Sequence, residues 1–355
     1  MTSISTKYRR INAFDQYKSG GSSICCDYKT GKSMQKKAGA GLLGFFKTEK
    51  GRKLVFYAAG TTTAGLFVAN FLPHTFGLKY YRDFVQCYQN GIEREVPPAV
   101  QQRVQLAMER LEVDQRERKF IKPFTVFGFD LFQAGTTKFR FGAALGIPVN
   151  YAYGSIDEIK RADIRFRDRQ VDWKADSGKL LENAIVLTED EQLFGLSKAI
   201  LQLQTHRVLM NSIFPSVSFF MVYTIGHYLN LRLDLFARHG SMRFVLYSIL
   251  GLFGLGSWSF MKDFNQVATD AEIDKRLATL GPQFVAAGVS YYDKHLKKNI
   301  ALRNLIGDNT YTALGNENYM LRQKSMPLTA RKSFFEEKWK ELQDAQQAQQ
   351  SAEAQ

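Results

Sequence analysis

Two polar clusters of this chain combine residue types and a spacing that could carry chemistry. The first lies in a stretch with apolar residues at helical spacing, 196–206, where Lys198 and Gln202 are one helical turn apart. The second is Asp270-Ala-Glu-Ile-Asp274, in which two carboxylates share one helix face. Two uncharged apolar stretches separate the clusters. This order of polar helix, apolar pair and acidic helix invites comparison with the zinc peptidases of membranes.

Membrane metallopeptidases with this layout carry His-Glu-x-x-His before a transmembrane hairpin and Glu-x-x-x-Asp after it. The two histidines and the later glutamate bind zinc, and the glutamate of the first motif activates water. Our alignment of the order and spacing places Lys198 and Gln202 at the histidine positions and Ala199 at the glutamate. Asp270 stands for the later glutamate. Two ligands and the general base are then missing, and a lysine ammonium repels zinc.

We therefore expect a peptidase-like layout without a catalytic residue, a metal or another cofactor, and so no enzyme activity. A membrane-embedded zinc metallopeptidase with an atypical site is the alternative. Other chemistry finds no support, because the chain has no phosphate-binding glycine loop, no C-x-x-C and no two histidines four residues apart. Three cysteines also exclude a secreted fold held by disulfides.

Three stretches without a charged residue are long enough to cross a bilayer as helices, which takes about 20 residues and at least about 17. They are 54–78, 208–231 and 244–261. Buried core helices are the alternative. Because only 12 residues join the second stretch to the third, these two predict a transmembrane hairpin.

The net charge of +14 is concentrated before the first stretch. Residues 1–53 hold 12 Lys and Arg against three acidic residues, and the hairpin turn is also basic. Basic flanks face the positive-inside side of a membrane. The two soluble parts then share the opposite face and can pack as one domain. The basic, acid-poor tail is typical of a mitochondrial targeting region, and a tail that binds nucleic acid or anionic lipid is the competing hypothesis.

The soluble parts mix helices and strands, so the fold class is an α+β membrane protein. Apolar spacing predicts an amphipathic helix over 99–119, and alternation predicts strands within 120–151 and at 171–173 and 184–187. Thr188 to Glu191 forms a capping box that starts a helix continuing to about 207, towards the second span. A long helical region over 263–299 is interrupted at Gly281-Pro282. The predicted division is a basic tail 1–53, span 54–78, soluble α+β part 79–207, span 208–231, span 244–261, helical part 262–342 packing with 79–207, and disordered tail 343–355.

Small residues mark two candidate helix-packing faces in the spans. They let helix backbones approach closely, either within this protein or towards another one. The candidates are Gly60, Ala64 and Gly65 on the first span and Gly251 and Gly254 on the third.

Four groups of residues in the soluble parts carry a family resemblance. They are Lys122-Pro-Phe-Thr-Val-Phe-Gly-Phe129 with Phe141-Gly-Ala-Ala-Leu-Gly-Ile-Pro148; Val171-Asp-Trp173 with Gly178 and Leu181; Asp274-x-Arg276 with Tyr291-Tyr-x-Lys294; and Asn299-Ile-Ala-Leu-Arg303 with Gly315-Asn316. With these residues the chain resembles the transmembrane protein 177 family of mitochondria over roughly residues 50–340. Most of the matching motif residues have an expected structural role: Pro123, Phe124, Gly146, Pro148, Asp172, Trp173, Asp274 and Arg303.

The resemblance implies a multi-pass protein of the mitochondrial inner membrane that assists cytochrome c oxidase biogenesis. It implies two protein partners, newly made oxidase subunit 2 and the dedicated membrane chaperone of that subunit, besides the lipid bilayer and without nucleic acid. In this setting the N-terminus faces the matrix and the soluble domain faces the intermembrane space. The resemblance brings no catalytic residue with it.

Overall fold

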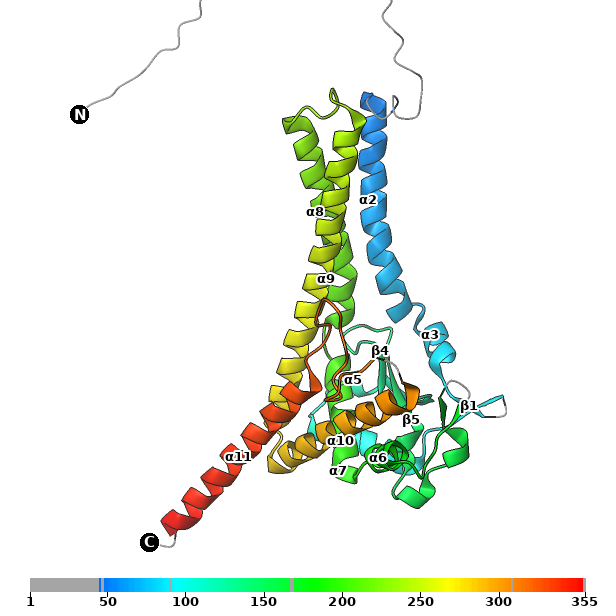
Figure 1. Cartoon of the computed structure of the whole chain (residues 1–355), viewed down its shortest axis with the longest axis vertical. Helices are drawn as coiled ribbons and strands as arrows, with labels where there is room; N and C mark the ends of the chain where they lie inside the picture. Colours follow the sequence, from blue (N-terminus) through cyan, green and yellow to red (C-terminus); the bar gives the residue numbers. More distant parts are fainter. Residues whose placement is uncertain (1–44, 46–47, 90, 167–168, 308, 354–355) are drawn as a thin grey trace, which may run out of the picture.

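The computed structural model describes residues 45, 48–89, 91–166, 169–307 and 309–353. Three long helices form one end of the molecule, and a mixed domain of helices and short strands forms the other (Figure 1). The helices are α2 (Glu49–Phe71), α3 (Leu78–Val85), α4 (Pro98–Arg110), α5 (Gln115–Arg118), α6 (Asp176–Ile185), α7 (Glu189–Leu203), α8 (Arg207–Arg232), α9 (Gly240–Ala278), α10 (Pro282–Ile306) and α11 (Leu328–Glu353). The strands are β1 (Tyr88–Gln89), β2 (Ile92–Glu93), β3 (Ile121–Val126), β4 (Phe132–Gly135), β5 (Ala143–Pro148), β6 (Arg165–Phe166) and β7 (Arg169–Gln170).

Helices α2, α8 and α9 are long and apolar enough to cross a membrane, and their apolar side chains are mostly exposed. Helix α8 packs along both of the other two. Two serines of α8 hold these contacts: the Ser216 hydroxyl donates to the carbonyl of Thr63 in α2 at 2.9 Å, and the Ser218 hydroxyl donates to the carbonyl of Gly254 in α9 at 2.6 Å. The chain is therefore a membrane protein with an α+β soluble part.

The three-stranded sheet has the order β3-β5-β4, with β5 parallel to β3 and antiparallel to β4. Every residue of β5 is buried, as expected for a central strand covered on both faces. The main core joins β5 to α4, α7 and α10, and an aromatic cluster lies at its centre. Phe194 of α7 contacts the rings of Tyr291, Tyr292 and Phe335 at centroid distances of 5.2 to 5.7 Å.

Several local predictions are confirmed. The Thr188 hydroxyl accepts from the backbone N–H of Glu191, whose carboxylate accepts from the N–H of Thr188, so the capping box starts α7. The predicted apolar face of 99–119 is buried along α4, but the helix ends at Arg110 and not at 119, and Gln115–Arg118 is a separate short helix. The long helical region breaks at Gly281, because its φ of 122° lies outside the range favoured by other residues. Pro282 then begins α10.

Five features of the local structure differ from the predictions. Residues 171–173 form no strand, and 184–187 end helix α6 and lead into α7, because the apolar pattern there belongs to a helix buried on one side. The helix from Thr188 does not continue into the second span but ends at Leu203. The third span is part of the 39-residue helix α9, which runs on into the domain. Residues 343–353 belong to α11, consistent with the high helix propensity of Gln, Ala and Glu.

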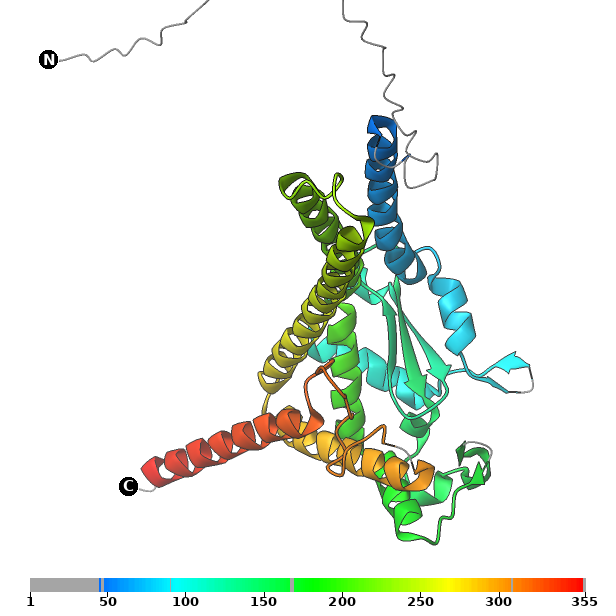
Figure 2. The same cartoon turned by 45° about the horizontal axis from the view of Figure 1, so that its top comes forward.

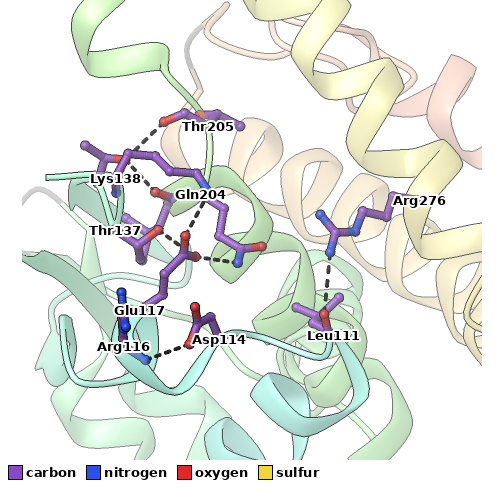
Figure 3. Close-up of polar contacts among 11 residues, drawn as sticks. Leu111, Asp114, Arg116, Glu117, Thr137, Lys138, Gln204, Thr205 and Arg276 are labelled. Carbon is purple, nitrogen blue, oxygen red and sulfur yellow. Dashed lines mark hydrogen bonds and ion pairs between the residues drawn. The ribbon is translucent and has the colours of Figure 1, made fainter.

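The end of α7 is fixed by a polar junction around Glu117 (Figure 3). The Glu117 carboxylate accepts from Thr137 at 3.1 Å, from Lys138 at 2.8 Å and from Gln204 at 2.8 Å. Burial alone would raise the pKa of Glu117, but these donors lower it, so the group stays ionised. The junction ties the break between α7 and α8 to the sheet side of the domain.

Candidate functional site

A cavity of about 610 Å³ lies in the soluble domain between α7, α9, α10 and the segment 309–327. This segment is drawn in orange to red beside α9 (Figure 1), and Figure 2 shows it crossing above α10. Lys198, Ala199, Gln202 and Asp270 all line the cavity. The four positions that the sequence alignment matched to a zinc site therefore come together in space, although Ala199 and Asp270 are 71 positions apart in the chain.

One end of the cavity is closed by Arg331 at the start of α11. Its guanidinium donates two hydrogen bonds to the carboxylate of Asp274, both at 2.6 Å, and lies 3.5 Å from that of Asp270. The Tyr292 hydroxyl donates to Asp274 at 2.9 Å. The side chains of Arg331, Asp270 and Asp274 are only 2 to 4% exposed. The two carboxylates share this one guanidinium, because a buried ion is tolerated only when it is paired and hydrogen-bonded.

A second ion pair lies on another wall of the cavity. The ammonium of Lys298 contacts the carboxylate of Asp130, which projects from the connection between β3 and β4. His295 lies beside this pair, and both its burial and the charge of Lys298 lower the pKa of its imidazole. His295 is therefore neutral at neutral pH, and Lys298 and Asp130 satisfy each other.

Lys198 differs from these groups. Its ammonium lies over the rings of Tyr291 and Tyr292, at 5.9 and 5.4 Å from their centroids, and within the described part of the chain it makes no hydrogen bond or ion pair. Burial, and then the nearby charge of Arg331, lower the pKa of Lys198 to about 8, against the opposing pull of the acidic groups. The cavity thus holds a cation without a partner.

Glycine 195 sets the position of Lys198, because it lets α7 approach α10 closely. A Cβ at residue 195 would lie 2.3 Å from the Tyr151 hydroxyl and 2.8 Å from the Tyr291 ring. Lys198 follows one turn later on the same face, and the fully buried Ala199 completes the contact. This close packing gives α7 a defined position in the cavity wall.

The family motif residues divide into structural positions and one member of the site. Gly146 is required by space, since a Cβ there would lie 2.4 Å from Val126, and Pro123, Phe124 and Pro148 build strands β3 and β5 around it. The Asp172 carboxylate accepts from the backbone N–H of Lys174 at 3.0 Å, and Trp173 is half-buried against a small satellite core. Arg303 is half-buried near the end of α10. Asp274 alone belongs to the cavity network, as the partner of Arg331.

Neither Arg331 nor the wall formed by segment 309–327 was predicted from the sequence. Arg331 belongs to a helix with many charged residues, which the sequence predicts to be exposed. No neighbouring residue indicates that Arg331 is buried. Within the described ranges, no group of three His, Cys, Asp or Glu side chains could hold a metal ion.

The small-residue positions of the spans do not share one environment. Gly254 packs inside the protein, where a Cβ would lie 2.6 Å from Val222 of α8. Gly60, Gly65 and Gly251 have no described atom within 4 Å of such a Cβ, and Ala64 is exposed. The first span therefore presents an open small-residue face, and the basic tail up to residue 44 lies outside the described residues.

Comparison with known proteins gives one consistent group of relatives. The chain is 29% identical to transmembrane protein 177 of Rattus norvegicus over 224 residues, which cover 62% of this chain and 72% of the relative. It is 25% identical to the protein of that name from Homo sapiens over 282 residues (78% and 90%), and 26% identical to the one from Xenopus laevis over 278 residues (76% and 89%).

No protein-family model and no solved structure matches the chain. The vertebrate relatives nevertheless cover most of its length. They share with it the membrane character that their name states and that α2, α8 and α9 provide. The chain belongs to the transmembrane protein 177 family.

Proposed function

We propose that this protein is a non-enzymatic assembly factor of the mitochondrial inner membrane. It associates with newly made cytochrome c oxidase subunit 2 and with the dedicated membrane chaperone of that subunit, and it stabilises the chaperone. Membership of the transmembrane protein 177 family supports the role. In this proposal the basic tail addresses the protein to mitochondria, the N-terminus faces the matrix and the soluble domain faces the intermembrane space.

The chemistry of the cavity is the observation that carries the non-enzymatic part of the proposal. Lys198, Ala199 and Gln202 stand where a peptidase of this layout needs two histidines and a glutamate. Arg331 binds the acidic side of the same cavity through Asp270 and Asp274. Two cations next to the position of a divalent metal oppose its binding by charge repulsion. We infer a peptidase-like layout whose catalytic positions now hold structural and ligand-binding groups.

Depletion of the protein tests the assembly role. Pulse-labelling of mitochondrial translation products should show faster loss of new subunit 2, and immunoblotting should show less chaperone. Re-expression of the wild-type chain should restore both. A Lys198→His, Ala199→Glu, Gln202→His triple variant should not gain proteolytic activity, because Arg331 still occupies the acidic side. Unchanged levels of both subunit 2 and its chaperone after depletion would contradict the role.

The membrane arrangement is tested by protease protection. Antibody epitopes within α4 and α11 should be protected in intact mitochondria and lost to protease after the outer membrane is opened. An epitope before residue 45 should stay protected. The opposite pattern would reverse the proposed orientation. Elemental analysis of the purified chain tests the metallopeptidase alternative. A stoichiometric zinc content would support that alternative.

A further inference from the structure

An apolar groove lies beside the cavity that contains Lys198, along α9 where the predicted third span ends. This α9 groove has a volume of about 640 Å³ and is lined by Leu255, Gly256, Ser259, Phe260, Phe264 and Val267. Leu321, Arg322 and Gln323 of the 309–327 segment line both the groove and the polar cavity. A polar site and an apolar site thus meet at one wall.

The side chains along the groove are apolar and exposed. Leu255 and Phe260 lie within the predicted span 244–261 and are 58% and 70% exposed, and Phe264 one turn further is 66% exposed. Met320 and Leu321 at the tip of the 309–327 segment are 95% and 93% exposed beside this part of α9. Apolar side chains so fully exposed at a membrane boundary are stable there because lipid chains cover them.

The cations around the polar end differ in whether a carboxylate contacts them. Arg331 is paired with Asp274 and Asp270, Lys298 with Asp130, and Arg322 with Asp263, which also lines the groove, at 3.1 Å. Lys198 is the cation of the described cavity lining that has no acidic partner. Glu317 stands on the exposed 309–327 segment at the rim, where burial raises the pKa of its carboxyl.

We propose that the cavity and the α9 groove together bind an anionic phospholipid, with the head-group phosphate at Lys198 and the acyl chains along α9. An unpaired ammonium inside a protein binds a phosphate through charge-assisted hydrogen bonds. The apolar wall from Leu255 to Val267 supplies about the length that lipid chains need, and the shared residues 321–323 link the two ends. The site goes beyond the assembly role, which does not require it.

Protonation of Lys198 makes the site sensitive to pH. Its pKa of about 8 in the empty cavity means that the ammonium is present below pH 8 and lost above it. Lipid binding should therefore weaken between pH 7 and pH 9. The charged and titratable groups facing Lys198 are Asp270 and Asp274 of α9, Tyr291, Tyr292, His295 and Lys298 of α10, Arg331 of α11, and Asp130.

Native mass spectrometry of the full chain in detergent tests the proposal, with phosphatidylglycerol and phosphatidylcholine of the same acyl chains as probes. The wild type should retain phosphatidylglycerol in preference. Lys198→Met, which keeps the aliphatic stem, should reduce that retention about tenfold, since one charge-assisted contact is lost. Glu317→Gln should increase it, because a carboxylate near the phosphate is removed.

Two glycines of α9 offer a matched pair for the apolar end. Gly256 lines the groove and Gly251 does not, and neither has a described atom within 4 Å of an added Cβ. Gly256→Leu should fill the groove and lower the retention of phosphatidylglycerol several-fold, whereas Gly251→Leu should leave it unchanged. Circular dichroism of each variant checks that the helices are intact.

Inorganic phosphate separates a lipid site from a site for the free ion. Calorimetric titration with phosphate should show at most weak binding, lost in Lys198→Met and unaffected by Gly256→Leu. Strong phosphate binding without a preference for phosphatidylglycerol would overturn the lipid proposal. Equal lipid retention by the wild type, Lys198→Met and Gly256→Leu would overturn it as well, as would Lys198-dependent retention of a polypeptide instead of lipid.

Discussion

The two cations that face each other across the cavity are held in opposite ways. Arg331 reaches two carboxylates and stacks 5.0 Å from the ring of Tyr292, whereas Lys198 has only the ring faces of Tyr291 and Tyr292. A buried charge with several partners fixes the fold around it, and a charge without a partner remains free to meet a ligand. The contrast assigns Arg331 to the architecture of the cavity and Lys198 to its binding function.

The largest effect is expected from Arg331→Met. The substitution leaves Asp274 buried without its cation, and breaking such a pair costs about 3–5 kcal/mol of unfolding free energy. The denaturant midpoint of the full chain in detergent, followed by circular dichroism, measures this loss. Lys338→Met on the exposed face of the same helix is the control and should leave the midpoint unchanged. If Arg331→Met and the control had the same denaturant midpoint, the structural role of Arg331 would be contradicted.

Gly195→Ala should have the next largest effect. The added methyl group would stand 2.3 Å from the Tyr151 hydroxyl and 2.8 Å from the ring of Tyr291 in α10, so α7 must move away from α10, at a cost of about 1–3 kcal/mol. Because α7 carries Lys198, phosphatidylglycerol retention should fall as well. Gly251→Ala, where the added methyl group meets no described atom, serves as the control. Unaltered stability and retention in Gly195→Ala would mean that the approach of the two helices is unimportant.

Tyr292→Phe tests a smaller part of the Arg331 side. The variant loses the hydrogen bond to Asp274 but keeps the ring beneath both cations, so we expect a loss of about 1 kcal/mol in unfolding free energy. Lipid retention should stay at the wild-type level, because Lys198 keeps its environment. Tyr319→Phe, on the 309–327 segment, provides a matched loss of a hydroxyl at a half-buried site. A large fall in lipid retention for Tyr292→Phe would show that the two sides act together.

The smallest effect on stability is expected from Lys198→Met at neutral pH. Burial lowers the pKa of Lys198 in the folded chain below its value in the unfolded chain, so the unfolded chain binds the proton more tightly. Relative to the variant, the unfolding free energy of the wild type should therefore increase as the pH rises from 8 to about 10.5. Parallel unfolding curves of both proteins from pH 7 to pH 10 measure the difference. A variant that is strongly destabilised at pH 7 would instead make Lys198 a structural residue.

The sequence predicts best those features whose cause is local. The capping box of Thr188 and Glu191, the strands within 120–151 and the break at Gly281 all follow from neighbouring residues. Three long apolar helices follow from the lack of charges over enough residues. The prediction failed where a local pattern fits two kinds of secondary structure. The short apolar pattern of 184–187 fits either a strand or the buried side of a helix, and the structure shows the end of a helix.

The cavity could be predicted only in part. The positions of Lys198, Gln202 and Asp270 follow from their order relative to the two apolar stretches, and the structure places them around one space. The pairing of Arg331 with Asp274 joins residues 57 positions apart and depends on how α11 packs across α9 and α10. Nothing near Arg331 distinguishes it from the exposed cations of the same helix. The segment 309–327 has no regular spacing of apolar residues, so its position beside the cavity could not be predicted either.

Helix α9 also has a mechanical consequence. Its 39 residues run without a break from the hairpin turn to the cavity, a length of about 58 Å at 1.5 Å per residue. A stiff rod of this length transmits any change of its tilt in the bilayer directly to Asp270 and Asp274 at its far end. Helix α8, by contrast, is separated from α7 by the break at 204–206, which can absorb such a motion. A change in the tilt of α9 should therefore move its wall of the cavity relative to the wall formed by α7.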